Sequence, residues 1–266
     1  MSYKQIGLLL SFSLSLLLFV SAAEDVQAET SANGGASVGF DANYKQEVKD
    51  PENPENPANP GTSPTTSGDL RIDFVPQFNF WSNKISNQDA TYYGNAQLFH
   101  DETGARGNFV QVSDYRGSAG GWMLQIRQET QFKNESTANK ELNGAVISLD
   151  KSWANSNRDQ SQAPIVSKDV IRIDNIGETY NLAQAEKGTG EGTWSIIFGA
   201  SIDNGQGRED TLSPRLDIQG NPILDAAFNN KPIYQNEALS LTVPGATAID
   251  PVSYQTVLTW ILSELP

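Results

Sequence analysis

The chain has 266 residues, no cysteine, one histidine and a formal net charge of −14 at pH 7. This acidic charge opposes binding to nucleic acid and to anionic membranes, because both depend on lysine and arginine side chains that neutralise phosphates. Without cysteine the chain can form no disulfide and carry no lipid on a cysteine, so an exported domain must be stabilised by an apolar core.

Residues 1–28 are predicted to be a secretory signal peptide. Lys4 precedes an uncharged apolar run from Ile6 to Val20, and Val26-Gln27-Ala28 has the small-residue pattern of a cleavage site. A membrane anchor is the alternative, but the run is shorter than the roughly 20 residues that a spanning helix needs. We therefore expect a mature chain of residues 29–266 that begins at Glu29 and has no contact with the membrane after cleavage.

The mature chain is predicted to form one domain in three parts. Residues 36–40 resemble a short strand, which we interpret as an N-terminal edge strand. Residues 45–68 are rich in proline and asparagine, and Asn-Pro recurs every three residues from Asn53 to Pro60. Because proline fixes φ and has no amide donor, this pattern predicts an exposed, mobile linker. The main body then spans residues 69–266.

The main body alternates short β-rich runs with Gly, Asn, Asp and Pro, and no long helical pattern competes with them. The candidate strands are 70–75, 78–81, 96–100, 109–114, 122–132, 145–149, 170–173, 193–199, 239–243 and 254–263. This spacing predicts an all-β fold, a single sandwich-like or barrel-like domain with long loops. Residues 152–167 are predicted to be a polar surface loop, and residues 203–234 a longer excursion with a helical turn at 224–229.

Few residues offer catalytic or metal-binding chemistry. His100 is the only histidine, and we expect it at the surface, near a strand end. The loop Asp203–Asp210 could offer oxygen ligands to calcium, but it lacks the spacing of a calcium-binding loop, so an acidic turn is the preferred interpretation. We expect no catalytic residue, no metal and no cofactor, although the many carboxylates leave a carbohydrate-active wall hydrolase as an alternative.

Two short motifs stand out, Trp122-Met-Leu124 after a glycine-rich turn and Trp260-Ile-Leu262 near the end of the sequence. Flat aromatic faces stack on sugar rings, so Trp122, Leu124, Trp260 and Leu262 are the candidate binding residues. Core packing is the alternative, because each Trp shares its strand face with other apolar residues. We expect the two tryptophans to lie near each other on adjacent or facing strands.

The paired motifs and their surroundings resemble the WxL domain of Gram-positive cell-surface proteins. The resemblance covers essentially the whole mature chain and includes the stretches 69–76, 114–117, 142–149, 192–199 and 241–245. It implies secretion, an all-β fold and non-covalent retention on the cell wall. The implied partners are peptidoglycan, a WxL-interacting wall protein and small wall-anchored companion proteins.

Non-covalent retention agrees with the sequence after the second motif. Only Ser263-Glu264-Leu265-Pro266 follow it, which leaves no room for a sorting signal of the LPxTG type. A released sugar-binding module is a further alternative.

Overall fold

The computed structural model describes residues 46–118 and 120–265, which belong to one compact unit. The predicted signal peptide and the predicted strand at 36–40 lie outside the described residues. Strands dominate the described chain, and the only helical elements described are two 3-10 turns, η1 (Gln160–Gln162) and η2 (Ala226–Phe228). The all-β prediction is therefore confirmed.

The first sheet is antiparallel, with strand order β1-β3-β10-β6. Its strands are β1 (Leu70–Phe74), β3 (Asn108–Asp114), β10 (Gly192–Phe198) and β6 (Ser152–Asn155). Every residue of β3 is buried, because both faces of this sheet are covered.

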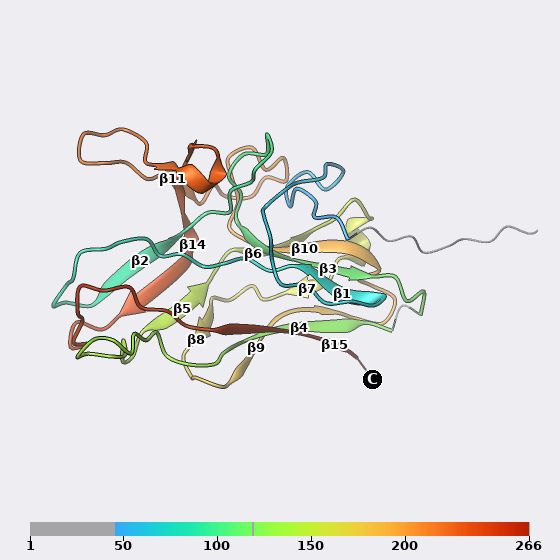
Figure 1. The fold of residues 1–266 in the computed structure, drawn as a ribbon. Helices are drawn as coiled ribbons and strands as arrows, with labels where there is room; N and C mark the ends of the chain where they lie inside the picture. Colours follow the sequence, from blue (N-terminus) through green and yellow to red (C-terminus); the bar gives the residue numbers. More distant parts are fainter. Residues whose placement is uncertain (1–45, 119, 266) are drawn as a thin grey trace, which may run out of the picture. The chain divides into compact units, whose positions relative to one another are not determined.

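The second sheet has the order β15-β4-β9-β7, with β15 at one edge (Figure 1). Its strands are β15 (Leu258–Glu264), β4 (Trp122–Gln128), β9 (Thr179–Ala185) and β7 (Ile165–Val166). In β4 buried and half-buried residues alternate strictly, as expected for a strand with one face on the core.

The third sheet has the order β11-β14-β5-β8, and β2 also pairs with the long strand β14. Its strands are β11 (Leu212–Pro214), β14 (Tyr234–Val243), β5 (Val146–Leu149), β8 (Ile171–Ile173) and β2 (Ala90–Asn95). A separate two-stranded ribbon is made of β12 (Leu224–Asp225) and β13 (Lys231–Pro232).

One apolar cluster joins the inner faces of the three sheets. It includes Trp194 from β10, Trp122 from β4 and Leu239 from β14, all of them fully buried. The sheets therefore pack as a sandwich around a shared core, which makes up for the absence of disulfides in a chain without cysteine.

The segment 46–60 packs over the outer face of the first sheet. Val48 and Ala58 lie against a second apolar cluster, formed on that face by Phe74, Phe99, Phe109, Trp153, Ile197 and Ala200. The side chain of Gln111 on β3 accepts a hydrogen bond from the amide of Lys49 (2.8 Å) and donates one to the carbonyl of Glu47 (3.0 Å). These contacts hold the segment like an additional, irregular layer.

A buried ionic cluster fixes the same segment. The guanidinium of Arg106 donates to both carboxylate oxygens of Asp50 at 2.9 Å and lies 3.3 Å from Glu52. Glu52 also accepts hydrogen bonds from the amide and hydroxyl of Ser201, at 2.7 and 2.5 Å. Asp50 and Glu52 are 4% and 2% exposed.

The prediction of an exposed linker at 45–68 is therefore wrong for its first half. Proline and asparagine do exclude regular structure there, but Asp50 pairs with an arginine 56 residues away. A local pattern carries no information about such a partner. The second half agrees better with the prediction, because residues 64–69 are exposed.

Hydrogen exchange should show this difference. We expect slow exchange at the amides of Asp50 and Ala58, which donate to the carbonyls of Asn56 and Val48 at 2.9 Å. The exposed residues Glu55 and Ser67, whose amides make no hydrogen bond to a described residue, should exchange fast and serve as internal controls. Equal, fast exchange at all four amides would show that the segment is a mobile linker after all.

Several predicted elements also differ from the structure. Residues 78–81 and 96–100 are not strands, and Gln97 makes only an isolated bridge with Arg106. Conversely, β6 lies in the predicted loop 152–167 and is mostly buried, while β2 and β9 were not predicted at all. The helical turn predicted at 224–229 is confirmed as η2.

Candidate functional site

The two Trp-x-Leu motifs lie on neighbouring antiparallel strands. Trp260 on β15 is opposite Ile126 on β4, and Leu262 is opposite Leu124. Residues opposite each other in an antiparallel pair project from the same face, so both motifs contribute to the inner face of the second sheet. This confirms adjacent strands, but the two tryptophans are not opposite each other, because Trp122 is opposite Glu264.

The motifs differ in burial. Trp122 and Leu124 are 0% exposed. The indole Nε1 of Trp122 donates to the carbonyl of Gly190 at 3.0 Å. Gly190 has φ +74, and a Cβ there would lie 2.7 Å from the same nitrogen, so a glycine is needed for the close approach. For the first motif, core packing is therefore the correct interpretation.

The second motif is only half-buried, because β15 forms the edge of its sheet. The ring of Trp260 meets the ring of Phe78 edge to face, with centroids 5.8 Å apart and planes at 76°. Edge-to-face contacts are favourable for aromatic rings and fix the orientation of both. Phe78 comes from an irregular segment after β1, and no local pattern predicts its contact with Trp260.

Beside Trp260 lies an open groove of about 600 Å³. Its lining includes the chain from Tyr254 to Trp260, residues 64–66, Ile72 and residues 75–78. Apolar side chains dominate it, among them Ile72, Val75, Phe78, Phe132, Tyr254 and Trp260. We call this feature the β15 groove.

The backbone of β15 adds a second property to the groove. Within the described residues, β15 pairs only with β4, so the polar groups along its other edge have no strand partner. An unpaired edge next to an apolar groove can accept an extended chain through main-chain hydrogen bonds.

The Asp-Tyr-Arg-Gly stretch before the first motif connects the two motif strands. Arg116 forms two hydrogen bonds with Asp114, at 2.9 and 2.7 Å, and donates to the carbonyl of Gly121 at 2.8 Å. Its other nitrogen lies 3.3 Å from Glu264 at the end of β15. Arg116 therefore fixes the turn that leads into Trp122 and contacts the strand of Trp260.

The remaining candidates offer little chemistry. His100 is exposed and stacks on Phe228 with ring centroids 4.5 Å apart, in agreement with its predicted surface position. In the loop Asp203–Asp210, the side chain of Asn204 bonds to the backbone of Ser201, Gln206 and Arg208, so an amide organises the turn. In the described part of the chain, no three acidic or histidine side chains gather as a metal site would require.

Comparison with protein families gives a match over residues 27–266 to the WxL model, described as WxL domain surface cell wall-binding. The chain belongs to the WxL family. No curated protein and no solved structure matches it. The WxL domain is a cell-wall-binding domain of the cell surface, and in its described residues no helix has the length and apolar character needed to span a membrane.

Within this WxL domain the four motif residues have different surroundings. Trp122 and Leu124 are core residues of β4, whereas Trp260 is a wall of the β15 groove. The neighbours of Trp260 in the groove, Phe78 and Tyr254, were not predicted as site residues. Phe78 follows Pro76 closely, and Tyr254 precedes the second motif strand, but neither position predicts a binding residue. Only the fold brings both side chains into one groove with Trp260.

Proposed function

We propose that this WxL domain is a secreted, non-catalytic surface protein retained non-covalently on the wall of a Gram-positive bacterium. The β15 groove binds peptidoglycan, a WxL-interacting wall protein, or both, and small wall-anchored proteins complete the assembly. The observation that carries the proposal is the unequal burial of the two motifs. Trp122 is completely buried in the core, whereas Trp260 is half-buried and lines an apolar groove.

The groove suits either ligand for the same physical reasons. Trp260, Phe78 and Tyr254 provide aromatic surface that packs on the apolar faces of sugars or on apolar side chains. The unpaired edge of β15 provides donors and acceptors for an extended peptide. Apolar contacts do not depend on charge, so a protein with a formal charge of −14 can use them on a wall rich in phosphate.

Trp260→Ala should separate binding from folding. We expect sedimentation with purified sacculi, or with walls that retain their companion proteins, to weaken by about thirtyfold, the effect of removing an aromatic hot spot worth about 2 kcal/mol. The unfolding free energy should fall by only about 1–2 kcal/mol because the side chain is half-buried. Sedimentation and urea unfolding of the same samples measure both effects.

Trp81→Ala is the matched control, because Trp81 is 41% exposed and does not line the groove. It should leave sedimentation unchanged. If Trp81→Ala and Trp260→Ala weaken sedimentation equally, the β15 groove is not the binding surface. Comparing bare sacculi with companion-bearing walls identifies the ligand, and release of reducing ends or muropeptides by the wild type would contradict the non-catalytic assignment.

A further inference from the structure

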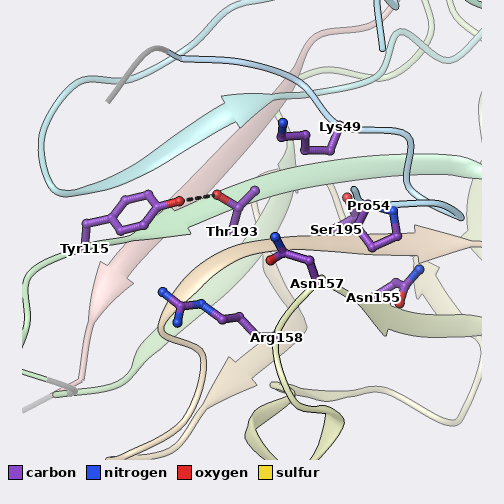
Figure 2. A pocket seen from close by; sticks show the side chains of 8 residues that line it. All are labelled: Lys49, Pro54, Tyr115, Asn155, Asn157, Arg158, Thr193 and Ser195. Atoms are coloured by element: carbon purple, nitrogen blue, oxygen red, sulfur yellow. Dashed lines mark hydrogen bonds between the residues drawn. The ribbon is translucent and has the colours of Figure 1, made fainter. Parts of the chain in front are cut away.

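A second pocket, of about 300 Å³, opens on the outer face of the first sheet (Figure 2). It lies where the segment 46–60 crosses the sheet, and its lining includes Lys49 and Pro54 from that segment and Thr193 and Ser195 from β10. Two of its eight lining residues are cations, Lys49 and Arg158, and none is acidic. The charged residues of this lining are therefore all cations, although the whole chain has a formal charge of −14.

Arg158 is the key cation. All eight arginines lie within the described residues. The other seven use their guanidinium groups in ion pairs, hydrogen bonds or a contact with a tryptophan ring. The guanidinium of Arg158 makes none of these with any described residue, so its charge is available to a ligand.

The backbone positions this arginine. Gly192 has φ +90, and a Cβ there would lie 2.6 Å from Nε of Arg158. The arginine side chain therefore lies directly on the glycine backbone at the start of β10. A cation held by packing, without an acidic partner, loses less freedom on binding an anion than a freely moving one.

The strand beneath provides a hydroxyl that lines the pocket. Ser195 is 3% exposed and lines the pocket, but its hydroxyl makes no hydrogen bond to a described residue. Its neighbour on the same strand face, Thr193, is already bonded to Ser113 at 2.7 Å and to Tyr115 at 2.8 Å (Figure 2). The hydroxyl of Ser195 is therefore open to the pocket and available to a polar group of a ligand.

We propose that this pocket binds an acidic saccharide, a sugar unit that carries a carboxylate or a phosphate. The guanidinium of Arg158 matches the paired oxygens of either anion, and Lys49, which is ion-paired with Glu47 at 2.6 Å, offers a further donor. Ser195 and the exposed amide of Asn157 are partners for ring hydroxyls. The volume is at the lower end of the range for ligand pockets, about 300–1,000 Å³, which suits one sugar unit.

This site is separate from the β15 groove and does not depend on its role. None of the eight residues that line the pocket also lines the groove. The pocket has polar and cationic walls where the groove has aromatic ones, so the two surfaces select different parts of a wall polymer.

The test titrates the mature protein with three sugars: glucuronate, glucose 6-phosphate and neutral glucose. Amide chemical shifts and calorimetry give the site and the affinity. We expect saturable binding of at least one acidic sugar at millimolar concentrations, shifts at Ser195 and Asn157, and no binding of glucose. Arg158→Gln should weaken binding on the order of tenfold or more, and Ser195→Ala by about fivefold.

Arg172→Gln is the matched control, because it removes the same charge from an exposed arginine outside the pocket. It should bind like the wild type. A response to glucuronate alone identifies a carboxylate-bearing sugar, and a response to glucose 6-phosphate alone a phosphate-bearing one. Equal binding of glucose, no saturable binding, or equal losses in Arg158→Gln and Arg172→Gln would each overturn the proposal.

Discussion

Trp122→Ala is expected to lower the free energy of unfolding by about 3–5 kcal/mol, the usual cost of truncating a fully buried Trp. The side chain is 0% exposed, and its loss also leaves the carbonyl of Gly190 without the indole donor. A domain of ordinary stability has about 5–15 kcal/mol in total, so the change removes a large share of the stability. Urea unfolding followed by far-UV circular dichroism measures the change.

The comparison with Trp260→Ala makes this result specific to the motif. Both changes remove an indole from a Trp-x-Leu strand, but only Trp122 is fully buried. Trp122→Ala should therefore lose stability and wall binding together, whereas Trp260→Ala should lose mainly binding. A Trp122→Ala variant with the urea midpoint of the wild type would contradict the core assignment.

Arg106→Met is expected to cost a similar amount, about 3–5 kcal/mol at pH 7, because it leaves the buried carboxylates of Asp50 and Glu52 without their cation. Methionine keeps the length of the side chain but carries no charge. Arg172→Met removes an exposed arginine whose partner, Asp174, is also exposed, and it should change stability by no more than about 0.5 kcal/mol. Urea unfolding of the two variants at pH 7 gives the comparison.

The pH dependence gives a second readout for Arg106→Met. Burial raises the pKa of Glu52, against the hydrogen bonds from Ser201 and the charge of Arg106. Burial also acts to raise the pKa of Asp50, but hydrogen bonds and the charge of Arg106 hold it below its ordinary value. Without Arg106 both folded-state pKa values should lie above the unfolded ones, so the folded state binds more protons and stability falls as pH rises through that range.

The deficit of Arg106→Met should therefore shrink between pH 7 and about pH 4.5, near the ordinary pKa of a carboxyl group. In the wild type, the contribution of Asp50 has the opposite sign: it is complete above the unfolded-state pKa and is lost as pH falls through the lowered one. A deficit that is constant over this range would show that the two carboxylates do not carry the cost.

The local sequence pattern predicts those strands in which apolar residues recur with regular spacing. The alternation in β4 and the apolar run of β10 were predicted because each strand faces the core with regular spacing. In β6, the polar residue Asn155 is buried because its amide donates to the carbonyls of Pro51 and Glu52, at 2.9 and 3.2 Å. Those partners lie more than 100 residues away in sequence, so the local pattern resembles a loop.

The candidate site was predictable to a similar extent. The motif residues and their adjacency followed from two matching apolar strands. The difference between Trp122 and Trp260 did not, because burial depends on which strand forms the sheet edge. The pocket around Arg158 is also not predictable from the sequence, because the local pattern of the segment that completes it, residues 46–60, predicts an exposed linker.

The pairing of β15 with β4 has a consequence for the order of folding. Leu258 pairs with Gln128, far back in the chain, and β15 is the last strand described. Ribosomes make chains from the N-terminus, so one edge of β4 stays unpaired until residues 258–264 have been made. Contacts of such long range form slowly. Pairing of the strand with the half-buried tryptophan is thus a late step in the folding of this domain, and a chain interrupted before β15 would leave one edge of β4 open to proteases.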